Sequence, residues 1–157
     1  TMVESYRKVY NDEFRKRAGE LGLDEIEVVT LASIVEKETG APQERAHIAG
    51  VFHNRLKQNW RMDTDPTVIY AVLLKRGSFD GNLTRDDLEM DSPYNTYRNK
   101  GLPPGPICSP GKAAIEAALW PKQTKHMFFV SKNNGTHHFC QTLSCHERAV
   151  ERYQGGG

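Results

Sequence analysis

The sequence lacks any long apolar run. No apolar stretch approaches the roughly 20 residues that a membrane-spanning helix needs, and no signal-peptide pattern opens the chain. The first residues instead predict an amphipathic helix, so we expect the chain to be a fragment of a longer protein. The terminal QGGG resembles a flexible tail.

An excess of charge of one sign is also missing. The chain has 21 basic and 20 acidic side chains, with a formal net charge of +1. The basic residues are scattered and interleaved with acids, which is typical of a solvated surface. This balance gives no general attraction to nucleic acid or to an anionic membrane, and we expect no nucleic-acid partner.

Cysteine is scarce and odd in number, with Cys108, Cys140 and Cys145 as the only three. Such a count does not indicate a disulfide scaffold, because at most one internal pair can form. Under oxidising conditions Cys140 and Cys145 are the candidates for that pair. The cysteines alone do not reveal the compartment.

The segment HHFCQTLSCH raises the alternative of a metal site. It brings five potential zinc ligands into ten residues, namely His137, His138, Cys140, Cys145 and His146. Their spacing fits no standard zinc finger, and neighbouring side chains on a strand point to opposite faces of a sheet. We therefore expect no metal and no cofactor.

Length and composition predict one soluble domain. The 157 residues are 38% apolar and 26% charged, which is an ordinary globular composition without repeats. Apolar periodicity, caps and breakers predict helices over 2–20, 25–39, 42–56, 66–77, 84–89, 109–119 and 142–153. The runs 127–131 and 136–140 flank Asn134-Gly135 and predict a β-hairpin. The predicted fold is α+β: mainly helical, with a small antiparallel sheet and a long proline-rich loop.

That loop is the segment DSPYNTYRNKGLPPGPICSPG, which has five prolines and three glycines in 21 residues. It is too rigid for a flexible linker, and long structured loops within compact domains are usually functional. Tyr94, Asn95 and Tyr97 lie in its middle and are suited to positioned hydrogen bonds and aromatic contacts. The alternative is a structural loop in which these side chains satisfy the backbone of turns.

Two glutamates end the apolar run LASIVEKETG. At about 100° per residue, Glu36 and Glu38 project about 160° apart, so they do not face one site together. Glu38 follows Leu31 and Ile34 along the apolar seam, and desolvation there raises the pKa of a carboxyl group. A raised pKa suits a general acid near neutral pH. The alternative is a pair of solvated carboxylates at a helix end.

Further motifs follow in order along the chain. Together they resemble the YceG-like endolytic murein transglycosylases over roughly residues 28–153, on the segments LASIVEKETG, VFHNRL, TDPTVIY, SPYNTY, GLPPGPI, THHF and CHERAV. Five or more collinear motifs are a far more specific signal than one. The resemblance implies that residues 25–154 form the catalytic domain, with residues 1–24 as a helix leading into it and 155–157 as the tail.

The resemblance also implies an activity. The catalytic acid of the family is the second glutamate of the EKE motif, which is Glu38 here. A lytic transglycosylase cleaves the MurNAc–GlcNAc bond with the C6 hydroxyl of MurNAc as nucleophile and leaves a 1,6-anhydro end, without metal or cofactor. One glutamate suffices because the nucleophile is already tethered.

Substrate-binding residues are expected around that acid. The expected set is Asp65, Tyr94, Asn95, Tyr97 and His137. Asp65 has the alternative role of a helix N-cap before Pro66. Asp63 stands where the family often has glutamine, and it adds a carboxylate. A carboxylate facing Glu38 would permit hydrolysis, so a muramidase-type hydrolase is one alternative; a non-catalytic peptidoglycan-binding module is another.

The resemblance implies a setting as well. Family members carry an N-terminal membrane helix and a small LysM-like domain, both absent from this sequence. The full-length protein is expected to be anchored in the bacterial cytoplasmic membrane with this domain on the periplasmic or extracytoplasmic side. Expected partners are peptidoglycan glycan strands, penicillin-binding proteins and the cell-wall synthesis machinery.

Overall fold

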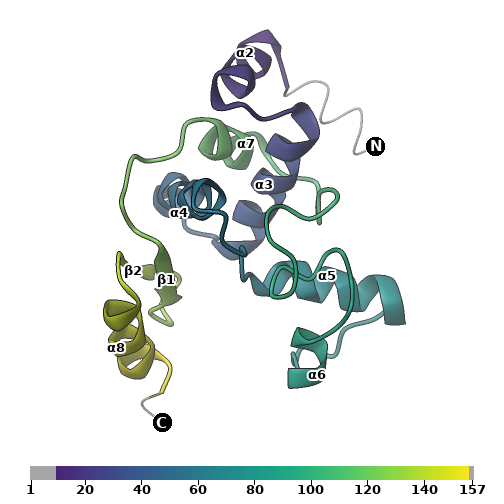
Figure 1. Ribbon diagram of the computed structural model, residues 1–157, viewed down its shortest axis with the longest axis vertical. Coiled ribbons are helices and arrows are strands. Elements are labelled where there is room, and N and C mark those ends of the chain that lie inside the picture. Colours follow the sequence, from purple (N-terminus) through teal and green to yellow (C-terminus); the bar gives the residue numbers. More distant parts are fainter. Residues whose placement is uncertain (1–9, 156–157) are drawn as a thin grey trace.

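A computed structural model describes residues 10–155 of the chain. It confirms an α+β fold that is mainly helical with one two-stranded antiparallel sheet (Figure 1). The elements are α2 Asp12–Leu21, α3 Glu25–Glu38, the 3₁₀ helix η1 Pro42–Glu44, α4 Arg45–Lys57, α5 Asp65–Arg76, α6 Arg85–Leu88, α7 Lys112–Leu119, β1 Phe128–Ser131, β2 His137–Cys140 and α8 Leu143–Tyr153. Within the described range, no helix combines the length and apolarity that crossing a membrane would require.

The centre of the core is α3. A capping box begins this helix, in which the Asp24 side chain accepts from the backbone N–H of Glu27 at 2.8 Å and the Glu27 side chain accepts from that of Asp24 at 3.0 Å. Every residue from Val28 to Val35 is buried, as expected for a helix that is enclosed on all sides. Helix α3 packs against α4 and α7, and α2 packs in turn on α3 and α7 (Figure 1).

The segment between α7 and the hairpin lies directly on α4. The N–H of Lys122 donates to the carbonyl of Ala46 at 2.9 Å, and Asn54 Nδ2 donates to the carbonyl of Thr124 at 2.8 Å. The approach is so close that a Cβ at Gly50 would lie 2.4 Å from the Lys122 carbonyl oxygen. Glycine at this position therefore permits the contact that carries the chain to the hairpin.

The hairpin pairs Phe128 with Cys140 and Ser131 with His137. Its loop covers residues 132–136 rather than only the predicted Asn134-Gly135 turn, and Lys132 N–H donates to the carbonyl of Thr136 at 2.9 Å. Helix α8 packs on this hairpin. The two units α5–α6 and hairpin–α8 lie on opposite sides of the lower part of the molecule, with α3 and α4 between and above them (Figure 1).

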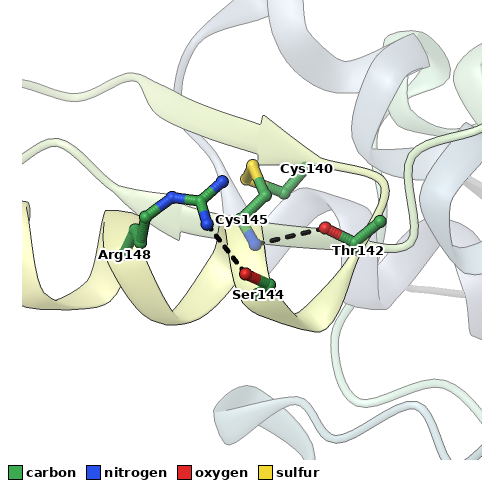
Figure 2. Close-up of a disulfide and its surroundings, with 5 residues drawn as sticks. All are labelled: Cys140, Thr142, Ser144, Cys145 and Arg148. Carbon is green, nitrogen blue, oxygen red and sulfur yellow. Dashed lines mark hydrogen bonds between the residues drawn. A yellow bond between two sulfur atoms is a disulfide. The ribbon is translucent and has the colours of Figure 1, made fainter.

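A disulfide joins Cys140 at the end of β2 to Cys145 in the first turn of α8, with Cα atoms 5.7 Å apart (Figure 2). Thr142 caps the same helix by accepting from the N–H of Cys145 at 3.2 Å. The pairing that the sequence left open is therefore present, and Cys108 is free. The disulfide and the cap fix the direction in which α8 leaves the sheet.

Helix starts differ from prediction at three places. Residues 2–9 of the predicted first helix lie outside the described part, and α2 begins at Asp12 because the Asn11 side chain accepts from the Phe14 N–H at 3.0 Å. Pro42 opens a 3₁₀ turn before α4 rather than α4 itself. Helix α7 begins at Lys112, later than the predicted Ser109, because Gly111 is extended and serves as its N-cap.

Candidate active site

A cavity of about 450 Å³ lies where the central helices meet the hairpin and the proline-rich loop. Its walls come from α3, α4, the segment after α4, the first residue of α5, the proline-rich loop, β1 and α8. They combine acids, one arginine and aromatic rings: Glu38, Arg55, Trp60, Asp63, Asp65, Tyr97, Phe128, Phe129, Leu143 and His146. The cavity is of a size that fits small ligands, and its polar groups converge on one space.

Glu38 is the last residue of α3, and its carboxyl group has a strongly perturbed pKa. This pKa is raised from 4.5 to about 7. Burial among the cavity walls and the negative charge of Asp65 both contribute to that rise. The charge of Arg55 and the hydroxyl of Thr64 oppose the shift. Desolvation is the largest cause, so the side chain can hold a proton near neutral pH and release it without a large change in free energy.

Asp65 and Tyr97 form a hydrogen-bonded pair within the cavity. The Tyr97 hydroxyl donates to Asp65 Oδ1 at 2.6 Å, and burial together with this bond raises the tyrosine pKa well above its usual range. Tyr97 thus stays a neutral donor, and the Asp65 charge lies close enough to raise the pKa of Glu38.

A buried threonine network holds that pair in place. The Thr96 hydroxyl accepts from the N–H of Thr64 at 3.0 Å and lies 2.8 Å from the hydroxyl of Thr67. These bonds tie the residues before Tyr97 to the first turn of α5, where Asp65 sits next to Pro66. The predicted N-cap role of Asp65 belongs instead to Thr64, whose extended backbone precedes the helix.

Arg55 was not among the predicted site residues. It is buried, its Nε donates to the Met127 carbonyl at 2.9 Å, and its Nη1 donates to the Met62 carbonyl. The guanidinium lies 6.0 Å from the ring centre of Phe128 and 5.7 Å from that of Phe129. The sequence did contain a signal that Arg55 is buried, because this residue follows Ile48 and Phe52 on the apolar face of α4.

The remaining walls of the cavity include aromatic rings, His146 and Asp63. The His146 ring stacks on Phe128 with centroids 4.9 Å apart, and burial lowers its pKa, which favours the neutral imidazole. Burial raises the pKa of Asp63, while Arg61, whose Nε lies 3.8 Å from Asp63 Oδ1, works against that rise. Trp60, Phe128 and His146 were also not predicted to line this cavity. Trp60 is exposed while Phe128 and His146 are half-buried, and single rings of this kind carry no distinctive sequence pattern.

Three predicted binding residues lie away from the cavity walls. Tyr94 packs edge-on against Tyr70 at 4.9 Å. Asn95 is buried and donates to the carbonyls of Leu88 and Met90 at 3.0 and 2.8 Å, while its Oδ1 accepts from the N–H of Tyr97. The geometry of Asn95 is that of the alternative, a structural loop whose side chains bond to the backbone of turns, and these bonds hold Tyr97 in place. A direct sugar contact of either residue stays a prediction.

His137 is the third predicted binding residue that lies away from the cavity walls. Its Nδ1 lies 2.9 Å from Glu44 Oε1, and its backbone N–H donates to Glu44 Oε2 at 2.9 Å. The pair joins β2 to η1 and is largely buried. His137 is thus engaged in holding the hairpin to the helical core, and its role as a sugar ligand stays a prediction.

The two glutamates of the EKE motif have separate surroundings, as their angular separation predicts. Glu36 Oε1 accepts from the N–H of Gly111 at 3.0 Å, and its other oxygen lies 3.8 Å from Arg45 Nη2. It therefore stabilises the start of α7, where a negative charge is favourable. Glu38 is the one that enters the cavity.

In the part of the chain that the structure describes, one cluster of histidine, cysteine or acidic side chains is close enough to share a metal ion. It comprises His138, Cys140 and Cys145, whose ligand atoms lie within 4.8 Å of one another. Both sulfur atoms are joined in the disulfide, and metal ligation requires thiolates. The cluster thus fits a covalent link better than a metal site.

A fold of central helices with a small hairpin, enclosing one desolvated glutamate, agrees with the family expected from the motifs. The YceG-like family matches residues 1–152, and the chain therefore belongs to this family. It is 42% identical over 151 residues to an endolytic murein transglycosylase of Bacillus subtilis, covering 96% of this chain and 40% of that protein. A Streptococcus pneumoniae protein of the same name is 35% identical over 133 residues, covering 81% of this chain and 23% of its own.

A solved structure supports the same assignment. The crystal structure of a YceG-like protein from Listeria monocytogenes superposes with a TM-score of 0.77 at 39% sequence identity, covering 87% of this chain and 43% of that one. The chain thus spans less than half the length of each of these relatives.

Proposed function

We propose that this domain is the catalytic part of an endolytic peptidoglycan lytic transglycosylase, a lyase that cleaves the β-1,4 bond between MurNAc and GlcNAc within glycan strands. Relatives named as endolytic murein transglycosylases at 42% and 35% identity support the substrate class. The observation that carries the proposal is Glu38, a carboxyl group with a pKa of about 7 that enters a cavity lined by hydrogen-bonding and aromatic side chains.

One carboxyl group can serve both halves of this reaction. Protonated Glu38 donates its proton to the glycosidic oxygen, and the bond from that oxygen to C1 of MurNAc breaks. The C6 hydroxyl of the same MurNAc then attacks C1, and the Glu38 carboxylate takes the hydroxyl proton, which restores the acid. Tethering of the nucleophile replaces the water and the second carboxylate that hydrolases need.

Neighbouring groups support this cycle. The Asp65 charge favours the protonated form of Glu38 before the first step, and Arg55 favours the anion that follows it. Positive charge develops at C1 in the transition state, and the anionic Asp65 in the same cavity is suited to stabilising it. The Tyr97 hydroxyl keeps that carboxylate oriented at 2.6 Å.

A second candidate is a muramidase-type hydrolase. It is favoured by the presence of Asp63 and Asp65 in the cavity with Glu38, since water-using glycosidases work with two carboxylates. The two mechanisms leave different ends on the glycan: a 1,6-anhydro end after transglycosylation and a reducing end after hydrolysis.

The proposed substrate also implies a place. Peptidoglycan lies outside the bacterial cytoplasmic membrane, and we propose that the domain acts on its extracytoplasmic face. Penicillin-binding proteins and the synthesis machinery are proposed partners on the ground of the family resemblance.

The test uses purified, uncrosslinked glycan strands and identifies product ends by mass spectrometry. Wild type should release 1,6-anhydro ends, Glu38→Gln should release none, and Glu36→Gln should act like wild type. Reducing ends from wild type would replace the transglycosylase with the hydrolase. Equal activity of wild type and Glu38→Gln, or none in wild type, would contradict the catalytic role.

A further inference from the structure

Trp60 lies at the junction of three cavities. It lines the Glu38 cavity, a second cavity of about 380 Å³ and a third of about 390 Å³ that also contains Asp63. Its side chain is 40% exposed, although it is the largest apolar side chain that a protein can show to water. A large exposed ring shared by three adjoining hollows indicates a binding surface rather than a packing position.

Contacts on both sides of Trp60 fix its backbone. Asn59 adopts a left-handed conformation at φ 59°, and the N–H of Trp60 turns back to the carbonyl of Arg55 at 2.9 Å, which closes the end of α4. Arg61 on the other side bridges to Lys100 and Gly101 in the proline-rich loop. The indole also contacts Phe128, with ring centres 5.5 Å apart.

The second cavity offers polar donors beside Trp60. Its walls are Asn54, Lys57, Gln58, Trp60, Thr124, Lys125, Met127 and Gln141. Within residues 10–155 neither lysine has an ion-pair partner within 4.0 Å. Ammonium and amide groups donate to hydroxyl and acetamido oxygens, and an aromatic face packs on the C–H face of a sugar ring.

Hydrogen bonds fix one wall of this second cavity. Asn54 Nδ2 donates both to the Thr124 carbonyl at 2.8 Å and to the His126 carbonyl at 3.0 Å, which fixes this stretch of chain alongside α4. The close approach at Gly50 supports the same stretch. Lys57 and Lys125 are therefore presented across a defined hollow from two separate segments.

We propose that this lysine-lined cavity is a second glycan subsite, and that a glycan strand leaves the Glu38 cavity by stacking a sugar ring on Trp60 and continuing into it. The inference rests on the proposed function, because an enzyme that cuts within a strand must hold sugars on both sides of the bond. The ligand class is an N-acetylated, β-1,4-linked sugar chain.

The sequence contains two tryptophans, which allows a direct test. Trp120 is also 40% exposed, packs on Phe14 at 5.7 Å and lines none of these three cavities, so it is a matched control. In the double variant that carries Glu38→Gln and Trp120→Phe, the tryptophan fluorescence comes from Trp60 alone and cleavage is blocked. Titration with a peptide-free GlcNAc–MurNAc octasaccharide should shift or quench it, whereas Glu38→Gln with Trp60→Phe should show no change.

Affinity for the octasaccharide separates the outcomes further. Trp60→Ala should weaken binding about tenfold or more, Trp60→Phe less, and Trp120→Ala not at all. Lys57→Ala with Lys125→Ala should weaken octasaccharide binding and leave a disaccharide unaffected. Wild-type affinity of Trp60→Ala, or an unchanged Trp60 signal at saturation, would overturn the inference.

The same series distinguishes this inference from the proposed function. If wild type cleaves strands but Trp60→Ala has an unchanged KM and kcat, the subsite is wrong and the activity stands. If wild type does not cleave but Trp60 reports binding, the activity is wrong and the subsite stands.

Discussion

Replacement of Asp65 by asparagine tests how the cavity sets the pKa of its acid. Asparagine keeps an oxygen that accepts from the Tyr97 hydroxyl and removes the charge that raises the Glu38 pKa. Burial remains, and it is the larger cause, so the pKa should fall only part of the way from about 7 toward 4.5. At an effective dielectric constant of about 20, a unit charge about 12 Å away shifts a pKa by roughly one unit and a nearer charge shifts it by more, so we expect a fall of about one unit or more.

That shift has a direct kinetic consequence. The reaction begins from protonated Glu38, so activity should fall as pH rises through its pKa. In wild type about 9% of the acid is protonated at pH 8, and a pKa lower by about one unit leaves about 1%. Asp65→Asn should therefore move the alkaline limb of kcat/KM down by about one pH unit, a loss of about tenfold at pH 8 beyond any uniform loss.

The assay measures release of product ends from glycan strands between pH 4.5 and 8.5. Tyr97→Phe is the matched control, because it removes the hydrogen bond at 2.6 Å but keeps the Asp65 charge, and its alkaline limb should stay in place. An alkaline limb of Asp65→Asn that coincides with wild type, or lies above it, would refute the electrostatic reasoning.

Three further predictions concern stability. The Glu38 proton stabilises the fold fully below pH 4.5, and this contribution is lost as pH rises through about 7. Glu38→Gln should therefore gain on the order of 3 kcal/mol over wild type in urea unfolding at pH 8.5 and little at pH 4.5, and equal gains at the two pH values would contradict this account. Gly50→Ala places a Cβ 2.4 Å from a backbone oxygen and should cost about 1–3 kcal/mol by the same method, whereas Gly19→Ala, with nothing within 4 Å, should not destabilise. Replacing Cys140 and Cys145 by serine should cost about 2 kcal/mol, and a reductant should lower wild-type stability alone; insensitivity of wild type to reduction would exclude the disulfide.

Most of the fold could be predicted from local signals. Glycines, prolines and caps set helix ends in the sequence itself, so α3, α5 and α8 begin and end within a residue of expectation. The start of α7 could not be predicted, because it depends on Glu36, a residue 75 positions away that accepts from the N–H of Gly111. Long-range hydrogen bonds of this kind leave no local pattern.

The site was predictable in part for the same reason. The position of Glu38 follows from helix geometry, and the Asp65–Tyr97 pair brings together two candidates from separate motifs. Arg55 and Trp60 were missed because their roles arise from walls contributed by β1 and the proline-rich loop. A sequence shows which side chains have suitable chemistry, but not which of them the tertiary fold turns inward.

The central claim is that Glu38 holds its proton near neutral pH. The most direct measurement is a ¹³C NMR titration of the glutamate side-chain carboxyl groups, with the Glu38 signal assigned by its absence in Glu38→Gln. We predict a midpoint near 7. A midpoint near the ordinary 4.5 would mean that the cavity does not keep this carboxyl protonated, and the proposed acid would be contradicted.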